Sequence, residues 1–181
     1  LREACDPRFG WTMPVGCPRD LPFFLLLEAD CRRAAMQLSL GQEIAGASAF
    51  SLGMVAEFES SLRARGPWFY RRLFWEAGMV GQTLYLEAEA AGLRSTGIGA
   101  YFDDLVHDVL GLSGHGFCSL YHFTVGGPIE DRRLTSRAGY PAPRDCTTSA
   151  AKSSQNEGFR RKNARRFARN VFAPGRIMTY I

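Results

Sequence analysis

The sequence has no apolar run long enough to cross a membrane and no cysteine pair with the spacing of a metal site. Its longest apolar run is Phe23–Leu27, whereas a membrane-spanning helix needs about 20 apolar residues. The 5 cysteines are odd in number and far apart, which argues against a disulfide scaffold and a zinc site. The first residues also lack the pattern of a signal peptide. We therefore expect a cytoplasmic protein with reduced thiols and no membrane partner.

Lysine is absent from the first 140 residues, and the positive charge lies at the other end of the chain. Residues 1–140 contain 13 arginines and 16 acidic residues, a net charge of −3. Residues 141–181 contain 9 basic and 2 acidic residues, a net charge of +7. Nucleic-acid binding would therefore depend on the arginine-rich stretch 159–169. We interpret that stretch as a basic extension without a nucleic-acid partner.

Changes in composition divide the chain into three parts. Residues 1–20 contain several prolines and glycines and are predicted to be irregular. Residues 21–141 are predicted to form one domain, because apolar residues recur there with regular spacing. Residues 142–181 lose that periodicity and are predicted to form a basic, flexible tail. The chain begins with Leu1, so we expect a fragment of a longer protein or a processed chain.

Three segments have the composition of β-strands. Phe23–Leu27 is an unbroken apolar run, which is typical of a strand buried on both faces. Ala49–Phe58 alternates loosely between apolar and polar residues, and Phe117–Val125 is rich in β-branched and aromatic residues. Together with the helices predicted between them, these strands indicate a mixed α/β arrangement.

The longest predicted helix is Trp68–Ala91. Its apolar stripe is expected to comprise Leu73, Ala77, Val80, Leu84, Ala88 and Ala91, widened by Phe74, Gly81 and Tyr85. Two interior glycines, Gly78 and Gly81, reduce helix propensity. We interpret them as positions where another helix packs closely, or alternatively where a flat ligand approaches the backbone.

Two shorter helices are predicted from capping residues. One begins at Cys31 after Asp30, and the other is Leu105–Leu110 after Asp103 and Asp104, since an aspartate side chain can accept hydrogen bonds from the first amide groups of a helix.

Two clusters could bind a ligand. Gly97, Ile98 and Gly99 would let a ligand reach the backbone, although a tight connection between two elements would also use these glycines. The spacing matches neither a dinucleotide-binding motif nor a P-loop. Arg133 and Arg137 could hold a phosphate group through paired hydrogen bonds, or they could be solvated surface residues.

The three histidines do not predict a catalytic or metal site. His107, His115 and His122 lack the spacing of zinc-binding motifs, and no serine lies in a nucleophile motif. His122 lies within a predicted strand, where a hydrogen-bonded core or edge histidine is expected. We therefore assign no metal ligand and no catalytic side chain.

Three blocks of sequence together resemble the nitroreductase-like flavin oxidoreductases. The blocks are residues 70–91, residues 92–104 with GLRSTGIGAYFDD, and residues 119–128 with SLYHFTVGGP. The similarity is greatest to the branch of azoline dehydrogenases that act in thiazole and oxazole peptide pathways. It covers residues 21–141. The family usually begins with an Arg-x-Ser-x-Arg segment that has no match in residues 1–20, so the chain resembles the C-terminal part of such a domain.

The resemblance implies an α+β fold, with a mixed sheet flanked by helices and a long central helix. It also implies bound FMN, a homodimer, and hydride transfer from NAD(P)H through the flavin to a small-molecule or peptide acceptor. The residues implied at the flavin are Gly97, Ile98, Gly99 and Ala100, with Arg133 or Arg137 at its phosphate. The alternative hypothesis is a family member without flavin that serves as a dimerisation or peptide-binding module.

Overall fold

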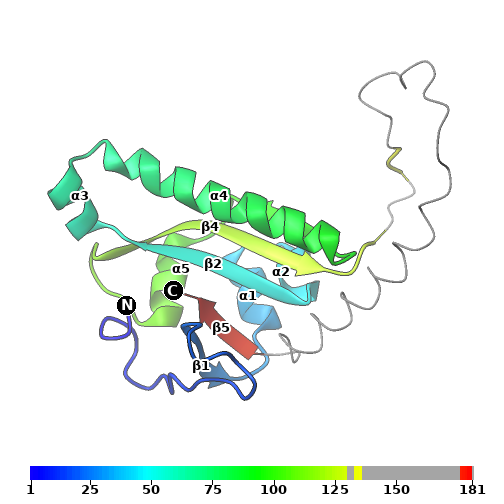
Figure 1. Ribbon diagram of the computed structural model, residues 1–181, viewed down its shortest axis with the longest axis horizontal. Coiled ribbons are helices and arrows are strands. Elements are labelled where there is room, and N and C mark those ends of the chain that lie inside the picture. The colour runs from blue at the N-terminus through cyan, green and yellow to red at the C-terminus, as the bar shows by residue number, and fades with distance from the viewer. Residues whose placement is uncertain (130–132, 136–175, 181) are drawn as a thin grey trace.

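The computed structural model describes residues 1–129, 133–135 and 176–180, and Figure 1 shows their arrangement. The chain order is β1 (Phe23–Glu28), α1 (Arg32–Leu38), α2 (Glu43–Ala47), β2 (Phe50–Glu57), α3 (Glu59–Arg65), α4 (Phe69–Ala90), β3 (Arg94–Ile98), α5 (Asp103–Leu110), β4 (Phe117–Gly126) and β5 (Arg176–Tyr180). Strands β2, β4 and β3 form one antiparallel sheet in that order, and β1 pairs with β5 in a second sheet. The α+β fold with a long central helix is therefore confirmed.

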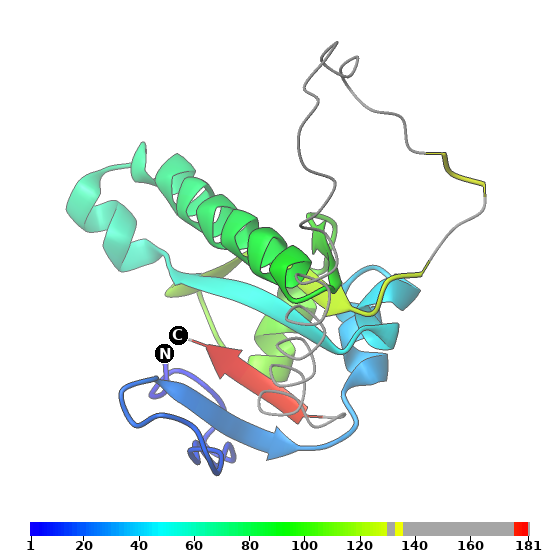
Figure 2. The same cartoon turned by 45° about the vertical axis from the view of Figure 1, so that its right-hand side comes forward.

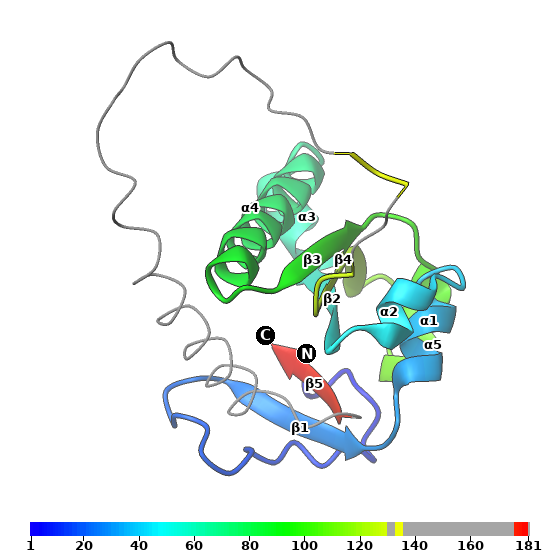
Figure 3. The same cartoon turned by 90° about the vertical axis from the view of Figure 1, so that its right-hand side faces the viewer.

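The long helix α4 and the small sheet β1–β5 lie on opposite sides of the three-stranded sheet. Helix α4 lies along one face of this sheet in both views (Figures 1 and 2). Helices α1, α2 and α5 lie together on the other side, near β1 and β5 (Figure 3). This arrangement leaves β3 at one edge of the three-stranded sheet, where the candidate site begins.

Strand β4 carries the centre of the core because it is the middle strand of its sheet. Phe123 is 0% exposed and clusters with Val125 and with Ala88 of α4. A second cluster joins Leu73 and Ala77 of α4 to Leu120 of β4. β-Branched and aromatic residues favour such a half-buried pleated surface, and the predicted strand Phe117–Val125 is confirmed.

Helix α4 is confirmed at Phe69–Ala90, but its buried face differs from the predicted stripe. Val80 and Phe74 are exposed, whereas Gly81 is buried as expected. A Cβ atom at Gly81 would lie 2.8 Å from Cε1 of Tyr121 on β4. The close packing at Gly81 is therefore between helix and sheet, and the prediction of a second helix there was wrong. At Gly78 a Cβ atom would meet nothing within 4 Å.

Strand β1 is confirmed, but the prediction that both of its faces are buried was wrong. Leu26 is buried, whereas Leu27 is 50% exposed. The strand pairs with β5 along one edge and contacts Thr12 through Leu25. β5 lies within the segment that was assigned to the basic tail. The boundary at residues 141 and 142 falls outside the described residues and stays a prediction. The basic tail predicted for residues 142–175 lies outside them as well.

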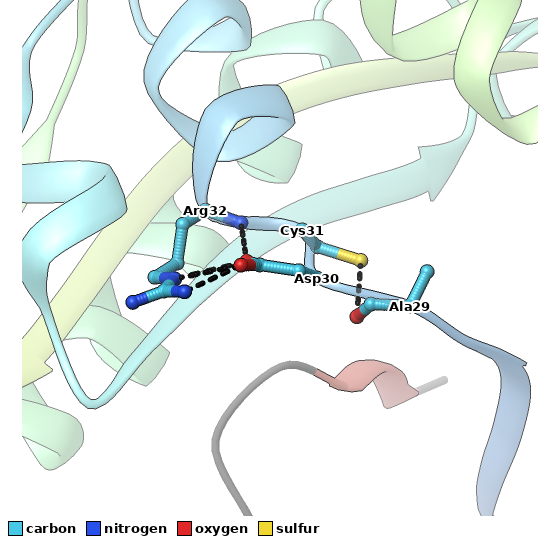
Figure 4. A network of polar contacts seen from close by, with 4 residues as sticks. All are labelled: Ala29, Asp30, Cys31 and Arg32. Atoms are coloured by element: carbon cyan, nitrogen blue, oxygen red, sulfur yellow. Dashed lines mark hydrogen bonds and ion pairs between the residues drawn. The ribbon is translucent and has the colours of Figure 1, made fainter.

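The helix predicted after Asp30 is interrupted, so two short helices form. Leu40 and Gly41 have φ values of 54° and 74°, which end α1 before α2 begins. The Asp30 carboxylate accepts hydrogen bonds from the backbone and the side chain of Arg32 (Figure 4). These bonds lower the pKa of Asp30 to about 2. Cys31 Sγ lies 3.2 Å from the Ala29 carbonyl oxygen.

Helix α5 begins two residues earlier than predicted. Asp103 and Asp104 lie in its first turn, and Phe102 precedes it without a side-chain cap. The prediction that the aspartates cap the helix was therefore wrong, although negative charge in a first turn still stabilises a helix. Gly111 ends α5 with φ 71°, as expected for a C-terminal glycine.

In the part of the chain that the structure describes, no helix has both the length and the apolar character needed to cross a membrane.

Candidate functional site

The candidate site lies where β3 leaves the sheet, at residues 97–101. Gly97 and Ile98 end the strand, and Gly99, Ala100 and Tyr101 connect it to α5. β3 itself was not predicted as a strand. Its pairing with β4 places Gly97 opposite Phe123 and Ile98 opposite His122, so the site begins beside the core.

Gly97 contacts two tyrosines, and the ring of Tyr121 occupies the place of its missing side chain. A Cβ atom at Gly97 would lie 1.6 Å from the hydroxyl oxygen of Tyr121, so a larger residue here would force the tyrosine or the strand to shift. The Gly97 N–H donates a hydrogen bond of 2.7 Å to the hydroxyl oxygen of Tyr85 on α4. The sequence pattern does not identify either tyrosine as part of this site. Both lie within the quoted family blocks, but neither has a motif spacing that would reveal the contact.

Gly99 and Ala100 are exposed, in contrast to Ile98, which is 3% exposed. A Cβ atom at Gly99 would meet nothing within 4 Å. Because neither residue carries a large side chain, a flat group could approach their backbone closely. Among the four predicted flavin-facing residues, Gly99 and Ala100 thus present an open surface, while Ile98 anchors the segment.

A buried polar cluster lies directly behind this segment. The Tyr101 ring stacks on the His122 ring at 4.2 Å with an angle of 2° between the planes. His122 Nε2 lies 3.2 Å from Ser119 Oγ. His122 is buried on the middle strand, so the expected hydrogen-bonded core histidine is confirmed.

Burial favours the neutral forms of Tyr101 and His122 in this cluster and of Cys118, which precedes Ser119 on β4. Desolvation, followed by the nearby negative charge of Asp103, raises the pKa of Tyr101 to about 12 and that of Cys118 to about 11. Desolvation lowers the pKa of His122, and Asp103 opposes that change. A deprotonated Cys118 nucleophile is therefore disfavoured at neutral pH.

The lowered pKa of His122 predicts a loss of stability in acid. The unfolded chain binds a proton near the ordinary value of 6.5, but the folded protein does so only at lower pH. The stabilisation is thus present above pH about 6.5 and is lost as the pH falls toward the folded pKa. Between pH 7 and 5, the melting temperature should fall more steeply for the wild type than for His122→Gln. His115→Gln, at an exposed position, should match the wild type. Equal slopes for the wild type and His122→Gln would contradict the assignment.

The other candidate arginines and histidines lie outside this cluster or outside the described residues. Arg133 is exposed, and Arg137 lies outside the described residues. His107 lies near the end of α5, and His115 lies in the turn before β4. The described residues contain no group of three or more His, Cys, Asp or Glu side chains that could hold a metal ion.

The chain is similar in sequence and fold to known nitroreductases. The model of the Nitroreductase family matches residues 21–127. A protein from Anabaena variabilis described as a nitroreductase has 35% identity to the chain, with a TM-score of 0.51. Nitroreductase A from Vibrio parahaemolyticus has 14% identity and a TM-score of 0.50, which shows similarity of fold. No curated protein sequence matches the chain significantly.

The matched lengths differ between these two proteins. The Anabaena match covers 55% of the chain but 20% of that protein. The Vibrio match covers 82% of the chain and 66% of that protein. The chain therefore spans only about a fifth of the length of the more similar of the two.

Proposed function

The chain belongs to the nitroreductase family, and on that premise we propose that it forms part of an FMN-dependent oxidoreductase. NAD(P)H would supply the hydride, and a small molecule or peptide would accept it. The quoted sequence blocks favour the azoline dehydrogenase branch and a C-terminal position within the family domain. We further propose that residues 21–141 form that domain, that residues 142–181 form an appended basic tail, and that the protein acts in the cytoplasm.

The open backbone at Gly99 and Ala100 is the observation that carries this proposal. FMN, when bound, supplies the hydride-transfer chemistry, while the protein supplies orientation and electrostatics. The exposed segment after β3 would lie against the flat ring, and Ile98 would hold the segment in place through burial in the core. The hydrogen bond from Gly97 to Tyr85 would fix the strand end relative to α4.

The phosphate contact is proposed for the arginines that follow β4. Arg133 is exposed, and Arg137 lies four residues further along the sequence. A guanidinium group can donate two parallel hydrogen bonds to a phosphate. This part of the proposal rests on the resemblance, which places a basic residue at the FMN phosphate.

We propose that the protein is a homodimer that uses the outer face of α4. Trp75, Met79 and Leu86 on this helix are exposed, as is Trp68, which directly precedes it. Their spacing of 7, 4 and 7 residues places them on one face. A contiguous exposed apolar surface commonly marks a protein interface. The same surface also supports the alternative function, a dimerisation or peptide-binding module without flavin.

The flavin proposal predicts that Gly99→Val weakens FMN binding by at least about tenfold, because the branched side chain occupies the space required by the ring. Fluorescence titration of the wild type and the variant with FMN measures this change. Gly127→Val is the matched control, since a Cβ atom at Gly127 also meets nothing within 4 Å. Gly127 follows β4 at the end that pairs with the start of β3, whereas Gly99 follows the other end of β3.

FMN affinity that is equal in Gly99→Val and the wild type would contradict the proposed flavin position. A wild-type chain that dimerises but takes up no FMN would favour the alternative function.

A further inference from the structure

We propose that Gln42, in the turn between α1 and α2, is a positioning residue for the segment 99–102. This inference rests on the proposed function, because it assigns that segment to the cofactor. The proposal concerns how the chain holds its own backbone in place before a cofactor binds. Gln42 would act through Ala100 and would not itself touch the reacting atoms.

Two hydrogen bonds join the α1–α2 turn to the segment 99–102. Gln42 Nε2 donates to the carbonyl oxygen of Ala100 at 3.2 Å. The backbone N–H of Phe102 donates to the carbonyl oxygen of Leu38 at 2.9 Å. The segment is therefore attached at Ala100 and at Phe102 to the end of α1 and the turn that follows it.

The Gln42 contact fixes the orientation of one peptide plane. Because a trans peptide is planar, its C=O and N–H groups point in opposite directions. A donor that holds the Ala100 carbonyl on one side therefore also fixes the direction of the Tyr101 N–H. Loss of that donor would allow the plane to rotate, which would change the backbone dipoles that the segment presents to a bound ring.

The α1–α2 turn is suited to hold the segment because it is itself well supported. Gly41 N–H bonds to the Met36 carbonyl at 2.9 Å, and the Gln42 N–H bonds to the Ser39 carbonyl at 3.1 Å. Helices α1 and α2 also pack closely, since a Cβ atom at Gly46 would lie 2.7 Å from the Arg32 carbonyl oxygen. The Gln42 side chain therefore projects from a fixed backbone.

The segment is supported from the sheet as well. Tyr101 stacks on His122, which the middle strand β4 holds in place. Between Ala100 and Phe102, the chain thus contacts the α1–α2 turn through hydrogen bonds and β4 through an aromatic stack. Among the side chains that support the segment, Gln42 can be replaced without disturbing the core, because it is only partly buried.

The test is Gln42→Glu, which keeps the shape of the side chain and removes its N–H donors. Gln37→Glu is the matched control, because Gln37 is exposed on α1. Amide hydrogen exchange at residues 99–102 is measured without FMN, and FMN affinity and the reduction potential of the bound flavin are measured on the same full chain. Gln42→Glu is expected to accelerate exchange and to weaken FMN binding by about fivefold, as expected for loss of one hydrogen bond. It should also shift the reduction potential, and Gln37→Glu should change none of these.

Unchanged hydrogen exchange in Gln42→Glu would overturn the inference. Faster exchange with unchanged FMN affinity and potential would overturn it as well, because the loosened segment would then not serve the cofactor. A wild-type chain that takes up no FMN contradicts the proposed function, and the wild-type titration reveals this before any variant is compared.

Discussion

Gly97→Ala should lower the free energy of unfolding by about 3 kcal/mol, at the upper end of the usual cost of overpacking. The added Cβ atom would lie 1.6 Å from the hydroxyl oxygen of Tyr121, 2.5 Å from its Cζ and 3.1 Å from its Cε2. The backbone of α4 lies close to the same ring, since a Cβ atom built at Gly81 would lie 2.8 Å from Cε1 of Tyr121, so the ring has little room to shift toward the helix. Urea unfolding of the wild type and the variant measures the difference.

Two further variants separate this steric effect from other consequences of replacing a glycine. Gly99→Ala should change the free energy of unfolding little, because its Cβ atom enters open space. Tyr121→Leu combined with Gly97→Ala should be less destabilising than the two single changes added together, since the shorter side chain relieves the clash. Equal costs for Gly97→Ala and Gly99→Ala would show that Tyr121 does not determine the need for glycine at residue 97.

Met79→Glu should convert the expected homodimer to a monomer at micromolar protein concentrations. Met79 is 71% exposed and Trp75 is 59% exposed, and both lie on the face of α4 opposite to Leu73 and Ala77. If a second copy covers this face, the substitution places an unpaired charge at the centre of the interface. The dimer dissociation constant should rise by at least about 30-fold, as for other central interface residues. Sedimentation velocity across a range of concentrations measures it.

Val15→Glu is the control for this change, because it adds the same charge at a fully exposed apolar residue in the N-terminal segment. It should leave the dissociation constant unchanged. A wild-type chain that is monomeric at all concentrations, or a dimer that Met79→Glu does not weaken, would contradict the proposed interface.

The sequence predicts elements whose stability comes from regular local patterns. Helix α4 and strands β2 and β4 appear within one or two residues of their expected ends, because their apolar periodicity coincides with the surfaces that they bury. The buried stripe of α4 is less well predicted. Gly81 faces the sheet beside Tyr121, as predicted, whereas Val80 and Phe74, although larger and more apolar, are exposed.

Elements that depend on distant partners could not be predicted in this way. β3 contains few strand-forming residues and is held by its pairing with β4, while β5 pairs with β1 across about 150 residues of sequence. Both faces of an apolar strand are buried only if two layers cover it, and Leu27 shows that β1 has a side open to solvent.

The candidate site was predicted through its glycines, but for a different physical reason at each position. Gly97 accommodates the hydroxyl group of Tyr121, whereas Gly99 borders open space. A sequence pattern records that glycine is present but not which neighbour excludes a side chain. The roles of Ile98, Ala100, Arg133 and Arg137 at a flavin stay predictions.

The most direct test of the central claim is titration of the full wild-type chain with FMN, followed by absorbance and fluorescence. We expect saturable binding of one FMN per chain with perturbed flavin absorbance, and a loss of affinity in Gly99→Val but not in Gly127→Val. Absence of FMN binding by the folded wild-type chain would contradict that claim.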